Sequence, residues 1–110
     1  MGEKLAALYL KGKGLEILEM NRNCPPHGEI DIIARNDDEI VFVEVKTAFK
    51  TNPDLLDEKV DHDKLKKISH AIYQYQKETE QIDDIRIDCI SVILQKKKPI
   101  IKHVEGIRLE

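Results

Sequence analysis

The sequence predicts one α/β domain in which helices flank a mixed central β-sheet. Its 110 residues are enough for a single hydrophobic core and too few for two. Four runs rich in β-branched residues and one apolar run have the composition of strands, and two stretches place apolar residues at helical spacing. No internal repeat or linker interrupts these segments. Their order is α-β-β-β-α-β-β, which favours a single α/β domain over residues 1–110.

The first predicted element is a helix over residues 3–11. Leu5, Leu8 and Tyr9 stand at positions i, i+3 and i+4, which places them on one helix face. Gly12 follows the last of these turns, as is typical of a helix C-terminus. We expect this helix to cover part of the sheet.

Three strands are expected next. Residues 15–20 predict the first strand. The segment 21–27 predicts a loop because it contains two consecutive prolines, and proline cannot donate to a central strand ladder. Residues 29–47 predict a β-hairpin, because two runs rich in valine and isoleucine flank a polar turn at 35–39.

The second half of the sequence predicts a long helix and two more strands. Residues 49–57 are polar and carry an Asn-Pro turn signal, and a helix is expected from about Leu55 to Glu78. Residues 85–94 and 100–104 predict strands joined by a basic turn. The apolar stripe of the long helix consists of Leu56, Val60, Ile68, Ala71, Ile72 and Tyr75.

Composition and charge exclude several classes of protein. Apolar residues make up 41% and charged residues 35%, a globular balance, and no run approaches the roughly 20 apolar residues of a membrane span. We therefore expect no membrane partner, and the two cysteines indicate a reducing, cytoplasmic location. The net charge of −3 argues against a general polyanion binder, but it leaves nucleic acid open because the lysines are clustered. The clusters are Lys4, Lys11 and Lys13; Lys64, Lys66 and Lys67; and Lys96, Lys97, Lys98 and Lys102.

The hairpin is the most informative stretch. If its turn is centred on residues 37–38, Asp31 lies opposite Glu44 and Glu29 lies opposite Lys46. Directly opposed residues have Cβ atoms about 4.5–5.5 Å apart, so the carboxylates of Asp31 and Glu44 would repel each other unless a cation lies between them. Glu44 and Lys46 are two residues apart and therefore share a face.

Two carboxylates and a lysine match what metal-dependent phosphodiester hydrolysis requires. Mg²⁺ or Mn²⁺ takes oxygen ligands, for which Asp31 and Glu44 are candidates, and Lys46 is a candidate to orient the attacking water. The alternative is an ordinary cross-strand ion pair between Lys46 and Glu29 on a solvated sheet surface. Charges in an apolar, two-sided sheet are costly without a task, which favours the metal site. Glu29 is then either a further member of the site or the ionic partner of Lys46.

These residues carry a family resemblance. Glu29 to Asp31, followed by Val43 to Thr47, resembles the Asp…Glu-x-Lys core of restriction-endonuclease-like nucleases. The wider pattern resembles the YraN family of bacterial proteins over nearly the whole chain. The matching positions are Gly2 to Ala6, Tyr9, Leu10, Gly14, Ile17 to Glu19, Gly28 to Asp31, Ile33, Ala34, Val60, Lys64, Ala71, Tyr75, Arg86 to Asp88 and Ile101 to Val104. The resemblance implies a restriction-endonuclease-like domain, similar to archaeal Holliday-junction resolvases, that cleaves DNA with Mg²⁺ or Mn²⁺; branched or structured DNA is the expected substrate.

The resemblance also implies further site residues. Glu3 corresponds to a first-helix glutamate near the metal, although an acid in a first helical turn also complements the helix dipole. Lys64 corresponds to a phosphate-contacting residue, although a lysine on an apolar stripe can simply extend its head into water. Lys4, Lys67 and Thr47 are the other candidate nucleic-acid contacts.

Two positions depart from the family pattern. Ala48 and Asn23 stand where the family usually has arginines, and both changes remove cations that would contact phosphates. A second hypothesis is therefore a nucleic-acid-binding module of the same fold with weak or no catalysis. A third is a structural domain whose acids solvate one sheet face. By analogy, resolvase chemistry on a two-fold junction would imply a homodimer.

Overall fold

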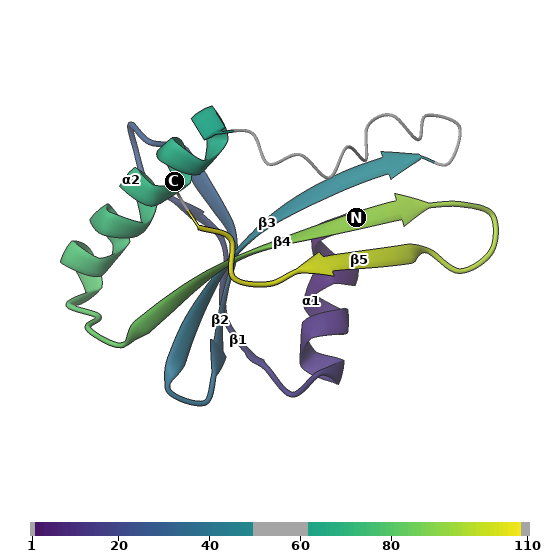
Figure 1. The fold of residues 1–110 in the computed structure, drawn as a ribbon, viewed down its shortest axis with the longest axis horizontal. Helices are drawn as coiled ribbons and strands as arrows, with labels where there is room; N and C mark the ends of the chain where they lie inside the picture. The colour runs from purple at the N-terminus through teal and green to yellow at the C-terminus, as the bar shows by residue number, and fades with distance from the viewer. Residues whose placement is uncertain (1, 50–61, 109–110) are drawn as a thin grey trace.

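The computed structural model describes residues 2–49 and 62–108. Within them the chain forms two helices and one five-stranded mixed sheet, so the predicted α/β class is confirmed (Figure 1). The elements are α1 (Gly2–Gly12), β1 (Glu16–Asn23), β2 (Glu29–Asn36), β3 (Glu39–Phe49), α2 (His62–Thr79), β4 (Asp84–Leu94) and β5 (Ile100–Val104).

Most predicted elements are present, with one correction in the first half. The first strand does not end at residue 20 but continues to Asn23, because Arg22 and Asn23 pair with Ile30 and Glu29 of β2. The polar side chains in this segment are compatible with β1 because it is an edge strand of the sheet. The prolines do lie in the connection that follows, as predicted. The predicted loop from residue 50 onward and the first turns of the long helix lie outside the described residues.

The sheet has the strand order β1-β2-β3-β4-β5. All neighbours are antiparallel except β3 and β4, which run parallel over a register that extends from Glu39↔Asp84 to Phe49↔Leu94. Parallel strands need a crossover connection, and α2 lies in the chain between these two strands. The long β3–β4 pair therefore forms the middle of the sheet.

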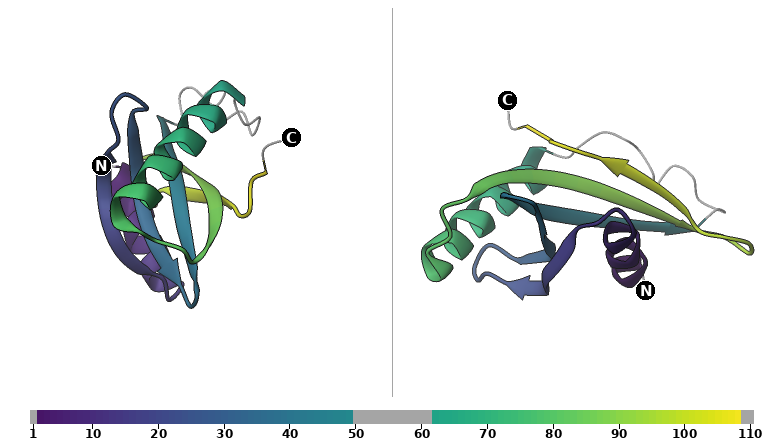
Figure 2. Two further views of the ribbon diagram at one scale, coloured as in Figure 1. Left: turned by 90° about the vertical axis from the view of Figure 1, so that its left-hand side faces the viewer. Right: turned by 90° about the horizontal axis from the view of Figure 1, so that it is seen from below.

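Two separate cores explain why the helices cover opposite faces. Consecutive strand residues point to opposite sides of a sheet. Val41 and Val43 pack in a cluster with Ala6 and Leu10 of α1. Ile40 and Phe42 pack in another cluster, which includes Leu65, Ile68 and Tyr75 of α2. Figure 2 shows α1 behind the strands and α2 in front of them in its left view.

Length and apolar character decide whether either of the two described helices could cross a membrane. Neither combines the length and the apolar character that crossing a bilayer would require.

Candidate metal and active site

The site begins where the β2–β3 hairpin ends its paired register. The predicted alignment is confirmed from Asn36↔Glu39 to Ile32↔Val43. One position further, Asp31 leaves the ladder, and its Oδ2 accepts a hydrogen bond from the backbone N–H of Val45 at 2.8 Å. The Asp31 carboxylate thus lies between the two strands, at the position where they separate.

Three carboxylates meet at this position. Glu3 of α1 and Glu29 and Asp31 of β2 offer oxygen atoms that all lie within 4.8 Å of one another. We call these three residues the acid cluster. Asn21 of β1 donates from its Nδ2 to Glu3 Oε2 at 2.6 Å and to Glu29 Oε1 at 2.8 Å. The acid cluster therefore draws on two elements, α1 and β2, and an amide from β1 bridges two of its acids.

Asn21 was missed by the sequence reasoning. Its φ of 54° is a left-handed conformation that asparagine adopts more readily than most residues. An asparagine directly after the first predicted strand is the signal that could have indicated such a position. The side-chain amide offers donors to the acids that a hydrophobic strand residue would lack.

The environment disfavours the charge of Asp31. Burial, together with the negative charges of Glu44, Glu3 and Glu29, raises the pKa of this carboxyl to about 6, although the hydrogen bond from Val45 acts in the opposite direction. A divalent cation at the cluster would remove most of this repulsion. The arrangement therefore has the electrostatics of a cation site.

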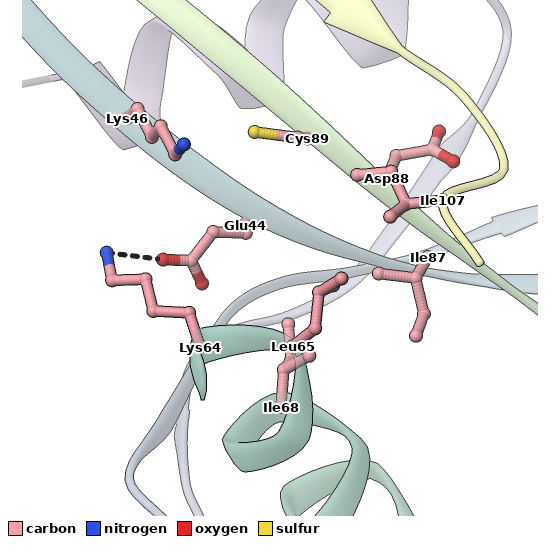
Figure 3. A pocket seen from close by; sticks show the side chains of 9 residues that line it. All are labelled: Glu44, Lys46, Lys64, Leu65, Ile68, Ile87, Asp88, Cys89 and Ile107. Atoms are coloured by element: carbon pink, nitrogen blue, oxygen red, sulfur yellow. Dashed lines mark hydrogen bonds and ion pairs between the residues drawn. The ribbon is translucent and has the colours of Figure 1, made fainter. Parts of the chain in front are cut away.

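Glu44 and Lys46 line an adjacent pocket between α2 and strands β3 and β4 (Figure 3). Glu44 Oε1 lies 3.2 Å from Lys64 Nζ of α2. Leu65 and Ile68 of α2 supply an apolar wall, and Cys89 of β4 lies beside the charged end. Cys89 was not predicted as a site residue; burial raises the pKa of its thiol, so it is a thiol rather than a thiolate.

Asp31, Glu44 and Lys46 are arranged differently from the predicted hairpin alignment. Glu44 lies outside the acid cluster and follows Phe42 on the face covered by α2, whereas Asp31 groups with Glu3 of the opposite helix. The negative charge of Glu44 nevertheless contributes to the raised pKa of Asp31. The alternative ion pair between Glu29 and Lys46 is absent among the described residues; Glu29 is bonded to Asn21 instead.

The predicted nucleic-acid contacts are only partly brought together. Lys64 joins Lys46 at the pocket, and Lys67 is exposed one helical turn further along α2. Lys4 is exposed on α1, next to Glu3 in sequence, and Thr47 packs against Gly2 at the start of that helix. Lys4 and Thr47 therefore lie at the α1 side, away from the lysines of α2.

A second polar cluster supports β4 and β5. Arg86 donates from Nε and Nη2 to the two oxygens of the buried Asp88, both at 2.9 Å. His103 Nε2 lies 2.7 Å from Asp88 Oδ2, and the Tyr9 hydroxyl lies 3.2 Å from His103 Nδ1. Burial raises the pKa of Asp88, but Arg86, the Gly106 N–H and His103 outweigh it, so the pKa lies below the ordinary value. This network joins α1 to β4 and β5.

Fold and site together define an α/β protein with an acid cluster where two central strands separate, beside a pocket that contains a glutamate and two lysines. Comparison with known proteins identifies the family. The model of the uncharacterised protein family UPF0102 matches residues 2–92, and the chain belongs to this family. The resemblance to the YraN family is thereby confirmed.

Curated relatives have similar lengths. A UPF0102 protein of Syntrophomonas wolfei is 38% identical and the alignment covers 94% of this chain and 90% of the relative. One from Clostridioides difficile is 43% identical over 94% of this chain and 89% of the relative. One from Syntrophus aciditrophicus is 42% identical over 100% of this chain and 80% of the relative.

Proposed function

We propose that this protein is a metal-dependent endonuclease that hydrolyses phosphodiester bonds in DNA, with a restriction-endonuclease-like domain over residues 1–110. Branched or structured DNA is the proposed substrate, on which a homodimer would present two sites. The observation that carries the proposal is the acid cluster: oxygens of Glu3, Glu29 and Asp31 lie within 4.8 Å of one another beside the strand that bears Glu44 and Lys46. Such a concentration of like charge is unfavourable without a cation.

The donor atoms fit Mg²⁺ or Mn²⁺. Both are hard ions that prefer carboxylate oxygens, and Mg²⁺ keeps several water ligands, so a few protein oxygens suffice. Asp31 and Glu3 would hold the ion together with Glu29, the third member of the acid cluster. Glu44, whose charge acts on Asp31, would add a ligand from β3 once it leaves Lys64. When bound, the ion supplies Lewis acidity to the phosphate and a template for the attacking water.

The protein side chains supply positioning and charge. Lys46, two residues after Glu44 on β3, would hold the attacking water by a hydrogen bond and offset the negative charge that develops on the phosphate. The water oxygen forms a new bond to phosphorus and gives up a proton to the solvent, while the bond from phosphorus to the leaving oxygen breaks and that oxygen takes up a proton from the solvent. Lys64 would contact a phosphate oxygen once it releases Glu44, its partner at 3.2 Å. The apolar wall of Leu65 and Ile68 lowers the local dielectric constant, which strengthens these interactions.

A binding module without catalysis is the second candidate, because Ala48 and Asn23 replace the family's arginines. Ala48 is buried at 1% exposure, so this position offers no side chain to a phosphate. Binding of DNA without cleavage would be the result that favours this candidate.

The test is cleavage of a panel of junction, flap, linear and single-stranded DNA with Mg²⁺ or Mn²⁺. We expect cleavage of at least one substrate by the parent protein, and at least a hundredfold loss, as is common for site residues, in Asp31→Asn and in Lys46→Ala. Asp37→Asn in the exposed hairpin turn and Lys66→Ala on the exposed side of α2 are the matched controls. Equal cleavage by Asp31→Asn and the parent would refute the assignment.

A further inference from the structure

A row of polar side chains crosses the sheet next to the proposed site. Lys46 of β3 is paired with Ser91 of β4, and Ser91 is paired with Lys102 of β5. Residues paired in register point to the same face, so the three side chains form one line across three strands. We call Lys46, Ser91 and Lys102 the basic row. Neighbouring strands lie about 4.8 Å apart, which separates the two lysine backbones by roughly 10 Å.

The charges of these strands are divided between the two faces. Arg86 forms ion pairs with both Asp88 and Glu105, and Asp88 also bonds to His103, which contacts Tyr9 of α1. These groups therefore belong to the α1 face. On the opposite face, the described positions level with Glu44 and beyond it contain, apart from Glu44 itself, lysine, serine, cysteine and aliphatic residues and no acid. They are Lys46, Ala48, Cys89, Ser91, Ile93, Ile100, Lys102 and Val104.

The basic row leads to the tip of the β4–β5 hairpin. Lys96, Lys97 and Lys98 occupy the turn between these strands, and all three are exposed. Figure 1 shows this hairpin reaching well past α1, and the right view of Figure 2 shows the same from below. The hairpin tip thus adds three cations at the far end of the surface that begins at Lys46.

We propose that the basic row and the hairpin tip bind the phosphodiester backbone of duplex DNA on one side of the bond to be cleaved. The position of the cleaved bond comes from the proposed function, and this inference rests on that function. Ammonium and hydroxyl groups donate hydrogen bonds to phosphate oxygens without reading sequence, so the contacts position the duplex. Lys64 lies across Glu44 from the basic row and would contact the backbone on the other side of the bond.

Lysines on an edge strand also have a different use. β5 is an edge of the sheet, and charged side chains there discourage pairing with another chain. That role predicts self-association of lysine variants and leaves DNA affinity unchanged. DNA contact predicts the reverse, so the two roles are separable by experiment.

The experiment measures binding of a labelled linear duplex by fluorescence anisotropy in EDTA, over a series of salt concentrations. Each phosphate contact contributes about 0.9 to the slope of log affinity against log salt. We expect Lys102→Gln to reduce the slope by about 0.9, and the triple variant Lys96→Gln, Lys97→Gln, Lys98→Gln to reduce it by about 2 to 3. The charge-matched control, Lys11→Gln, Lys66→Gln, Lys77→Gln, changes three exposed lysines of the helices and should leave the slope nearly unchanged.

Cleavage is measured in parallel so that the two proposals are judged separately. The hairpin variants should raise KM for duplex DNA with kcat unchanged. Slopes equal to those of the control, or a parent protein that does not bind duplex DNA, would overturn the DNA-contact proposal even if cleavage is observed. Reduced slopes without cleavage by any protein would support the surface and refute the nuclease.

Discussion

At the level of single residues, Asp31 occupies a position that disfavours its own ionisation. Its pKa is raised from 3.8 to about 6 by burial and by three neighbouring acids. Between pH 3.8 and about pH 6, the folded protein retains a proton on Asp31 that the unfolded chain has lost. The free energy of unfolding therefore falls as the pH rises from 3.8 to about 6, and changes little from this group above that range.

Replacement of this residue tests that account. In metal-free buffer, Asp31→Asn should remove the fall in stability over this pH range and should be at least as stable as the parent at pH 7, because an asparagine oxygen can still accept the Val45 N–H. Chemical denaturation at a series of pH values measures both quantities. Asp37→Asn, in the exposed turn, should keep the parent's pH profile. A parent-like slope in Asp31→Asn would show that the repulsion is not centred on this carboxyl.

Asp88 has the opposite role, since its charge is compensated in the fold. Asp88→Asn removes the carboxylate that accepts two hydrogen bonds from Arg86, and leaves a guanidinium that is only 18% exposed without this partner. Breaking a buried ion pair in this way costs about 3–5 kcal/mol. Thermal or urea unfolding measures the loss.

Glu39→Gln is the matched control for Asp88→Asn. Glu39 contacts Arg86 Nη1 at 3.2 Å but is itself 35% exposed, so its loss should cost below about 1 kcal/mol. Equal effects of the two substitutions would mean that the buried Asp88 adds nothing beyond a surface ion pair.

At the level of elements, the start of α1 must approach β3 closely to place Glu3 in the acid cluster. A Cβ atom on Gly2 would clash with the Oγ1 of Thr47. Gly2→Ala should therefore destabilise the protein by about 1–3 kcal/mol, as overpacking does, and weaken metal binding by moving Glu3. Unfolding experiments and a metal titration measure the two effects.

The double variant Gly2→Ala with Thr47→Ala separates packing from helix propensity. Removing Oγ1 leaves the Thr47 Cβ at 3.1 Å from the added methyl group, which requires only a small shift. Most of the lost stability should return. Failure to recover it would mean that Gly2 is required for another reason.

The elements themselves were largely predictable from the sequence. A polar turn and two runs of β-branched residues predicted the hairpin register. The observed pairs from Asn36↔Glu39 to Ile32↔Val43 agree with this prediction. The extension of β1 to Asn23 was not predictable from local composition, because polar residues are tolerated there only through pairing with β2 at an edge.

The candidate site was predictable as a set of residues and not as an arrangement. Strand alternation placed Asp31 beside Glu44, but the ladder opens one position earlier and Asp31 binds the Val45 amide. The grouping of Glu3 with Glu29 depends on how α1 lies on the sheet, and the bridging Asn21 depends on a backbone conformation at φ 54°. Neither of these is encoded in a local spacing pattern.

At the scale of the whole molecule, two helices on opposite faces each bring one charged group to an acid of the β2–β3 hairpin. α1 contributes Glu3, and α2 contributes Lys64. The long β3–β4 pair carries Glu44 and Lys46 through the middle and continues into the β4–β5 hairpin. Site and proposed DNA surface are thereby parts of one sheet.

The most direct measurement of the central claim is a calorimetric titration of the metal-free protein with Mn²⁺ or Mg²⁺ at a pH above 6. The parent and Asp37→Asn should bind the ion saturably, and Asp31→Asn and Glu3→Gln should bind it at least tenfold more weakly. Affinity in the parent should also fall as the pH drops below about 6, because protonated Asp31 competes with the ion. Saturable binding that is the same in Asp31→Asn as in the parent, or no binding by the parent, would contradict the assignment of this cluster as a metal site.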